Sequence, residues 1–152
     1  MIKAWIQLII FSSKCINTEK IDNCESLNQE IVQNALLSNI LIMSINCVEN
    51  HVHFLIYLNE KLSIGKTTDL LKNITLVKLR EKQFIELDFR WKDEYLAITI
   101  SPALVEKERL LIQQQQQLHL KSSLHDEIEM LLHEEEERYL NLSTSDIMSE
   151  SN

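Results

Sequence analysis

The chain has 152 residues, is 45% hydrophobic and 25% charged, and carries a net charge of −8 with one glycine and one proline. These values are those of one globular domain with a buried core. The negative charge argues against binding of duplex DNA through a broad basic surface. The acidic excess lies late: residues 103–152 hold 4 basic and 11 acidic residues, whereas residues 1–102 hold 11 and 12.

Cysteine content and hydropathy exclude further classes. The cysteines Cys15, Cys24 and Cys47 are odd in number and lack the spacing of a structural zinc site, which favours a reduced, cytoplasmic setting. Apolar runs such as IQLII and FLIYL are too short to span a bilayer, so we expect no membrane partner. The opening MIKAWIQLIIF alternates like a strand and has no small-residue cleavage site, so we expect no signal peptide.

The predicted elements follow from hydrophobic periodicity and from cap residues. In chain order they are a strand (3–11), a helix (26–38), two strands paired as a hairpin (40–48 and 51–58), a helix (64–82), a strand (94–100) and two helices (102–119 and 123–142). Asn39 is predicted to end the first helix, Ser63 to cap the second, and Pro102 to stand at the first position of the third.

The apolar stripes of the first two helices are of unequal clarity. In the first helix, Leu27, Ile31, Ala35 and Leu36 have helical spacing. In the second, the apolar positions only partly keep a period of 3.6; they are Leu70, Leu71, Ile74, Val77 and Leu79.

The order β-α-β-β-α-β predicts an α+β fold of the ferredoxin-like or RRM-like kind, in which helices cover one face of an antiparallel sheet, followed by C-terminal helices. We expect one domain over residues 1–121, including the helix 102–119. An acidic helix (122–142) and a disordered tail (143–152) are expected to follow it.

The stretch VENHVHFLIYL carries His51 and His53 inside a strand pattern. Side chains at i and i+2 of a strand point to one face, roughly 6.5–7 Å apart. Two such imidazoles can converge on a cation, but the pattern also fits ordinary half-exposed histidines. The spacing alone leaves both interpretations open.

Four segments together resemble one family. They are WIQLIIFSSK, NHVHFLIYLNEKLSIGKTTDLLKN, FRWKDEYLAITISP and VEKERLLIQQQQQLH. From about residue 4 to residue 130 the chain is similar to the single-tyrosine transposases of the HUH endonuclease superfamily. These are TnpA-like proteins of compact insertion sequences, with the REP-associated tyrosine transposases as relatives.

The resemblance implies DNA transposition: cleavage of single-stranded DNA at a hairpin by a helix-borne tyrosine, which forms a 5′-phosphotyrosine link. It implies a divalent cation, Mg²⁺ or Mn²⁺, held by His51, His53 and Gln115. It places Leu111 at the position of the nucleophilic tyrosine, one helical turn before Gln115. A leucine cannot attack phosphorus, so the resemblance implies impaired chemistry. It also implies a homodimer, with the helix after Pro102 packing across subunits.

Three further departures from the family pattern concern the first strand, the fourth strand and the C-terminal segment. Gln7 stands where many relatives have a histidine, and Glu94 where a glycine is usual before Tyr95. The segment after Gln115 is acidic where relatives are commonly basic, and it would repel a DNA backbone.

Alternative functions remain open from the sequence. An active metal-dependent endonuclease could use Tyr57, Tyr95, Tyr139 or a metal-bound water as the nucleophile. A repurposed protein-interaction module could use the acidic helix as a dock. Basic residues that could contact DNA phosphates follow the first strand or lie on the second predicted helix: Lys14, Lys66, Lys72, Lys78 and Arg80.

Overall fold

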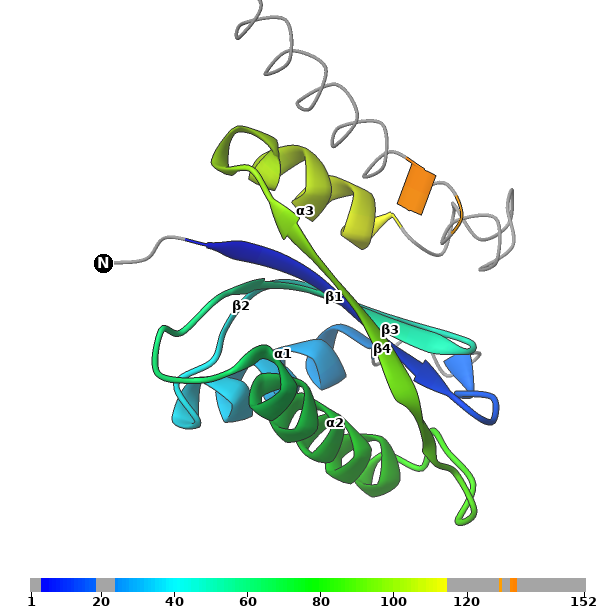
Figure 1. Cartoon of the computed structure of the whole chain (residues 1–152). Helices are drawn as coiled ribbons and strands as arrows, with labels where there is room; N and C mark the ends of the chain where they lie inside the picture. Colours follow the sequence, from blue (N-terminus) through cyan, green and yellow to red (C-terminus); the bar gives the residue numbers. More distant parts are fainter. Residues whose placement is uncertain (1–3, 19–23, 115–128, 130–131, 134–152) are drawn as a thin grey trace, which may run out of the picture. The chain divides into compact units, whose positions relative to one another are not determined.

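The computed structural model describes residues 4–18, 24–114, 129 and 132–133. Its elements are β1 (Trp5–Ser12), α1 (Cys24–Leu37), β2 (Leu41–Val48), β3 (His51–Tyr57), α2 (Ile64–Glu81), β4 (Trp91–Ile100), a short 3₁₀ helix (Pro102–Leu104) and α3 (Val105–Gln113). The chain divides into two compact units, Met1–Gln115 and Gln116–Asn152, and these elements all belong to the first. The predicted α+β fold with its β-α-β-β-α-β order is confirmed (Figure 1).

The sheet has four antiparallel strands in the order β2-β3-β1-β4. β2 and β3 form the predicted hairpin, in which Val48 pairs with His51 across the two-residue turn of Glu49 and Asn50. β1 then pairs with β3 on one side and with β4 on the other. β3 is therefore an interior strand with a neighbour along each edge.

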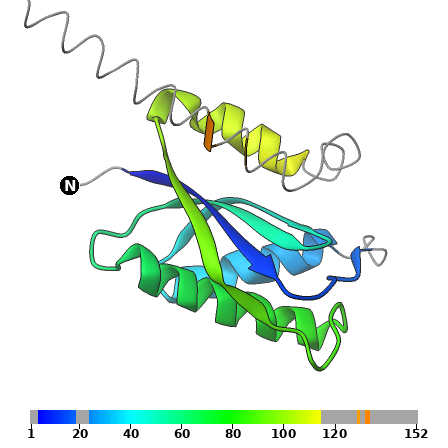
Figure 2. The same cartoon turned by 45° about the vertical axis from the view of Figure 1, so that its right-hand side comes forward.

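The two faces of the sheet are covered by different helices. α1 and α2 lie on one face, and α3 lies on the other over β2 and β3 (Figures 1 and 2). The core between the sheet and the helix pair is fully or nearly fully buried and includes Ile6, Leu8, Ile10, Leu27, Ile31, Val52, Phe54, Ile56, Leu71 and Leu79. Since side chains alternate along a strand, the residues between these strand positions face α3.

The ends of α1 and α2 have specific hydrogen bonds. After α1, Asn39 has a φ of 60°, the Asn39 N–H donates to Leu36 O and the Ile40 N–H donates to Ala35 O, which is a Schellman motif. At the start of α2, the Ser63 hydroxyl accepts from the Lys66 N–H at 3.0 Å. Both predicted boundary residues are confirmed.

The burial of Leu36 and the start of β4 differ from the sequence-based expectations. Leu36 was expected on the buried stripe of α1, but its side chain is 59% exposed. β4 begins at Trp91 and not at Glu94, because Trp91 pairs with Ser12 and its indole N–H donates to Lys72 O at 2.8 Å.

α3 ends at Gln113, where a helix to His119 was expected; residues 115–119 lie outside the described part. So do the predicted boundary at residue 121, the tail 143–152 and most of the acidic segment. Within that segment, Glu129, Leu132 and His133 are described and helical.

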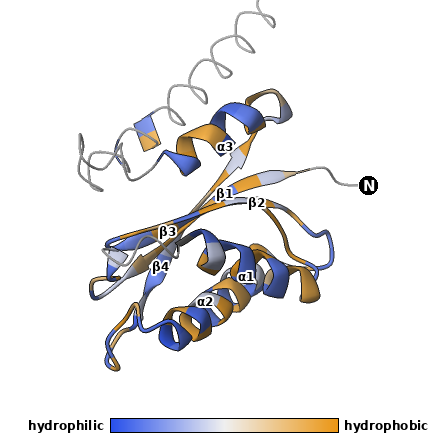
Figure 3. Cartoon of the chain, turned by 180° about the vertical axis from the view of Figure 1, so that it is seen from behind, coloured by the Kyte–Doolittle hydropathy of each residue, from blue (hydrophilic) through white to orange (hydrophobic). Residues whose placement is uncertain are grey.

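Apolar and polar residues alternate along α1 and α2 in a way typical of amphipathic helices at the surface of a core (Figure 3). Among the described helices, none has the length and apolarity that crossing a bilayer requires.

Candidate functional site

His51 and His53 lie on β3, which is paired with β1 on one side and with β2 on the other. His51 pairs with Phe11 of β1 and Val48 of β2, and His53 pairs with Ile9 and Asn46. Both histidines are 0% exposed. The interpretation of the pair as half-exposed strand histidines is therefore wrong, because a neighbouring strand lies on each side and α3 lies over this face.

Each imidazole has an amide beside its Nδ1 atom. His51 Nδ1 is 2.7 Å from Asn50 Oδ1, and because a carbonyl oxygen only accepts, Nδ1 is the donor of this bond. His53 Nδ1 is 3.4 Å from Nε2 of Gln7, which reaches it from β1. Amide partners thus flank the Nδ1 side of both rings.

The two rings are arranged edge to face, with centroids 4.7 Å apart and an interplanar angle of 67°. The Nε2 atoms of both rings are buried. Imidazole nitrogens are ligands for divalent transition-metal ions, whereas an amide oxygen suits Mg²⁺ or Mn²⁺, so a mixed set of this kind fits Mn²⁺ better than Mg²⁺. Among the described residues, no third histidine, cysteine, aspartate or glutamate completes a metal-binding group with the pair.

α3 is fastened to the sheet beside the histidines. Asn46, which pairs with His53, donates from Nδ2 to Ile112 O at 3.0 Å, and the Ser44 hydroxyl donates to Arg109 O at 3.4 Å. Ile112 is 0% exposed. The hydrogen bond from Asn46 therefore holds the backbone of α3 at Ile112 above β2, at the residue that pairs with His53.

Leu111 immediately precedes this anchor residue in α3 and is partly buried. The structure therefore brings the position aligned with the nucleophilic tyrosine to the same face of the sheet as the histidine pair. Gln115, the expected third ligand, lies outside the described residues.

The two strand tyrosines lie in other places. Tyr57 is on the face of His53, but four residues further along β3, which is about 13 Å at the usual rise of a strand. Its ring packs edge to face on Trp5, with centroids 4.9 Å apart. Tyr95 pairs with Ile10 and therefore faces α2, where its hydroxyl lies 3.9 Å from the Cβ that Gly65 would carry. That face is opposite to the histidine pair.

The basic residues do not gather at the histidines. Lys14 forms an exposed ion pair with Asp88, and the pKa of Asp88 is lowered chiefly by the hydrogen bond from Lys14. Lys72 donates from Nζ to Lys92 O at 2.8 Å and to Asp93 O at 3.3 Å, both on β4. Lys66 and Arg80 are exposed on α2, which covers the opposite face of the sheet.

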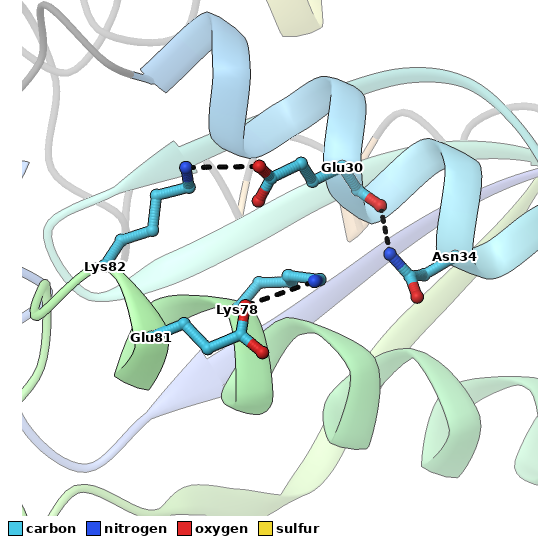
Figure 4. Close-up of polar contacts among 5 residues, drawn as sticks. All are labelled: Glu30, Asn34, Lys78, Glu81 and Lys82. Carbon is cyan, nitrogen blue, oxygen red and sulfur yellow. Dashed lines mark hydrogen bonds and ion pairs between the residues drawn. The ribbon is translucent and has the colours of Figure 1, made fainter.

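Lys78 lies on α2 beside a polar contact that reaches α1 (Figure 4). It forms an ion pair with Glu81 at 3.1 Å, while Lys82 reaches Glu30 of α1 at 3.3 Å. The Glu30 carbonyl accepts in turn from Asn34 Nδ2 at 2.8 Å. Lys82 thus connects the end of α2 to α1, whereas Lys78 has its partner, Glu81, within α2.

Three side chains of the site were not selected from the sequence: Asn46, Asn50 and Gln7 in its position beside His53. Gln7 and Asn46 are polar residues at strand positions between apolar neighbours, whereas Asn50 lies in the turn between Glu49 and His51. Gln7 and Asn46 are 3% and 9% exposed, and such buried amides need partners. A polar residue at a strand position expected to be buried on the face of the histidines could therefore have indicated Gln7 and Asn46.

Comparisons with known proteins identify the family and support the fold. Residues 6–115 match the model of the family described as "Transposase IS200 like". A crystal structure of a candidate transposase from Deinococcus radiodurans R1 superposes with a TM-score of 0.54 at 14% identity, covering 76% of this chain and 92% of that one, and so supports the fold. A search of curated proteins gave no match. Since the family match spans the sheet, the histidine pair and α3, this chain belongs to the IS200-like transposase family.

Proposed function

We propose that this protein binds single-stranded or hairpin DNA of an insertion sequence, and that its strand-transfer chemistry is impaired because Leu111 replaces the nucleophile. The observation that carries this proposal is the buried pair of His51 and His53 beneath the helix that bears Leu111. The family membership supports the class of activity, DNA transposition.

The charge of the first compact unit is compatible with nucleic-acid binding. Residues 1–115 hold 13 basic and 14 acidic residues, so the unit is nearly neutral although the chain carries −8. Binding of a single strand needs local basic contacts and stacking surfaces more than a large net charge. We assign phosphate contacts to Lys14, Lys66, Lys72, Lys78 and Arg80. Four of them belong to α2, on the face opposite the histidine pair, so these contacts would hold a part of the DNA outside the cation site.

His51 and His53 would hold a divalent cation through Nε2, because Nδ1 of each ring faces an amide. Gln115 is the proposed third ligand. A bound Mg²⁺ or Mn²⁺ supplies charge neutralisation and orientation of a DNA phosphate. The protein's own contribution is to hold the two imidazoles adjacent and shielded from bulk water beneath α3.

The missing nucleophile makes a clear test possible. The wild-type protein would be incubated with Mn²⁺ and a 3′-labelled hairpin carrying a single-stranded foot, because a 5′-phosphotyrosine link keeps the protein on the fragment with the 3′ end. The products would be resolved on a denaturing gel, while binding is followed by fluorescence anisotropy. We expect binding that depends on His51 and His53, without a covalent protein–DNA adduct. His51→Ala serves as the matched variant.

Each possible result decides a part of the proposal. An adduct from the wild type would show that another nucleophile is active and would overturn the proposed impairment. Absence of binding to single-stranded and hairpin DNA at low salt would overturn the DNA-binding function and favour an interaction module. Cleavage that is lost in His51→Ala would support an active metal-dependent endonuclease instead.

We also propose a homodimer in which the helix after Pro102 packs across subunits. Leu104, Leu111 and Leu118 recur every seven residues, which is compatible with helix pairing. Light scattering of a chain truncated after Ser101 should show monomers where the full chain shows dimers. Dimers that persist after the truncation would contradict this assembly.

A further inference from the structure

The Gln7 side chain lies beside His53 but has no role in the proposed DNA chemistry described above. It is 3% exposed, its Nε2 lies 3.4 Å from His53 Nδ1, and its Oε1 is buried without a hydrogen-bond partner among the described residues. A buried amide oxygen without a donor is unfavourable, because it has lost its hydrogen bonds to water. The same side chain therefore holds an unused acceptor next to a proposed metal ligand.

The orientation of this amide decides which nitrogen of His53 carries the proton. If Nε2 of Gln7 donates to Nδ1, then a neutral His53 has its proton on Nε2, and that nitrogen cannot bind a cation. If the amide is rotated by about 180°, Oε1 accepts from Nδ1–H, and the lone pair of His53 lies on Nε2. The oxygen and the NH₂ group are similar in size, so this rotation fits the same buried space.

We propose that Gln7 is a positioning residue for the cation site: in the metal-bound protein its Oε1 accepts from His53 Nδ1–H and holds the imidazole in the tautomer that binds through Nε2. The inference rests on the proposed metal-dependent function. Partners of this kind fix the ring orientation of metal-binding histidines and raise their affinity for the ion.

The neighbouring histidine provides an internal comparison. Asn50 Oδ1 already accepts from His51 Nδ1 at 2.7 Å, which leaves the lone pair of a neutral His51 on Nε2. With Gln7 rotated, the two rings would have the same tautomer and would present the same type of nitrogen. The two amides thus act alike, one from the hairpin turn and one from β1.

Metal affinity and tautomer can be measured without any DNA reaction. Binding of Mn²⁺ to the full chain would be measured by titration calorimetry for the wild type, Gln7→Met and Gln7→Glu. Gln7→Met has similar length but no acceptor, so we expect a 10–100-fold loss of Mn²⁺ affinity. Gln7→Glu retains an acceptor oxygen and should restore most of it.

A matched control distinguishes this role from general packing. Leu55 pairs with Gln7 across β1 and β3, and it is 0% exposed. Leu55→Met keeps the volume of this buried position and should bind Mn²⁺ as the wild type does. Equal loss of affinity in Leu55→Met and Gln7→Met would contradict the inference, because it would indicate a packing effect.

The wild type alone gives an independent test if Gln7→Met does not fold. Long-range ¹H–¹⁵N spectra in saturating Mg²⁺, assigned with His53→Ala, should show the proton of His53 on Nδ1. A proton on Nε2 under these conditions would overturn the inference. Wild-type Mn²⁺ binding that Gln7→Met leaves unchanged would refute this role only, whereas a wild type that binds no Mn²⁺ would refute the metal site as well.

Discussion

Asn46 and Ile112 are joined by a hydrogen bond of 3.0 Å from a strand side chain to a helix carbonyl, and this bond fixes α3 next to His53. Both residues are buried. The cover over the histidine face therefore depends on polar contacts, of which this one is shorter than the bond from Ser44 to Arg109 O, in addition to apolar packing. Its consequences for stability and access can be measured separately.

Asn46→Ala removes this contact. We expect the free energy of unfolding to fall by about 1–2 kcal/mol, the usual range for a buried hydrogen bond, and the amides of α3 to exchange faster with solvent. Urea denaturation and hydrogen exchange measure the two effects. Ser44→Ala is the control, since its bond to Arg109 O is longer at 3.4 Å and should matter less. Unchanged exchange in α3 after Asn46→Ala would contradict the proposed anchor.

A cation bound by the histidine pair should stabilise the fold. At a free Mn²⁺ concentration of 100 times the dissociation constant, linkage predicts about 2.7 kcal/mol of added stability. His53→Ala should abolish the Mn²⁺-dependent rise in Tm, as measured by differential scanning calorimetry. His133→Ala should leave it intact, because His133 lies outside the first compact unit. A rise in Tm that persists in His53→Ala would place the ion elsewhere.

Leu111→Tyr supplies a phenol at the position aligned with the family's nucleophile. Leu111 is partly buried, so a larger ring can be accommodated with its hydroxyl at the surface. We expect this variant to form a covalent adduct with hairpin DNA in the presence of Mn²⁺, seen as a shifted band on a denaturing gel. Leu111→Phe has the ring without the hydroxyl and should form none. If Leu111→Tyr binds DNA but stays inert, a second defect exists in the site.

Asn39 ends α1 with a φ of 60°, a conformation that asparagine tolerates and β-branched residues do not. Asn39→Val should therefore lower the free energy of unfolding by about 1–2 kcal/mol, whereas Asn39→Gly should leave it unchanged or raise it slightly. Urea denaturation at equal slope provides the comparison. Equal stabilities of the two variants would show that the left-handed conformation is not kept in solution.

The Lys14–Asp88 ion pair predicts a pH dependence. The hydrogen bond from Lys14 lowers the pKa of Asp88 below its ordinary value of 3.8. A lowered folded-state pKa stabilises the fold above that ordinary value, and the contribution is lost as the pH falls through the folded-state pKa. In Lys14→Met the carboxyl of Asp88, followed by ¹³C NMR, should titrate nearer 3.8. An unchanged titration curve would mean that the pair does not form in solution.

The sequence predicted most of the fold because its start and stop signals are strong. Ser63 caps α2 and Asn39 closes α1 as expected. The stripe of α2 was less clear because threonines occupy part of it: Thr67 and Thr68 are buried, and their hydroxyls donate to the Ser63 and Ile64 carbonyls. These side chains satisfy their polar groups within the helix, so hydrophobicity alone underestimates their burial.

The site was predicted less completely, because it depends on contacts between distant segments. The spacing of His51 and His53 placed both on one face of a strand, but their burial follows from the order of strands and from α3. The partner of His53 comes from β1, 46 residues away in the sequence. No local pattern predicts that contact, since the register of β1 against β3 creates it.

Because β3 lies between two other strands, the histidine positions are more constrained by the fold than the position of Leu111 on α3. The two histidines are residues of β3, whose backbone forms hydrogen bonds with a strand on each side. Their positions therefore cannot change without breaking the sheet. Position 111, at which the reaction would begin, belongs to α3, a helix that follows the last strand and has few contacts with the sheet. Under the proposed function, a leucine in place of the phenol would therefore remove the reaction and leave the histidine-bearing sheet whole, and one substitution in the helix should suffice to test whether that sheet is still competent.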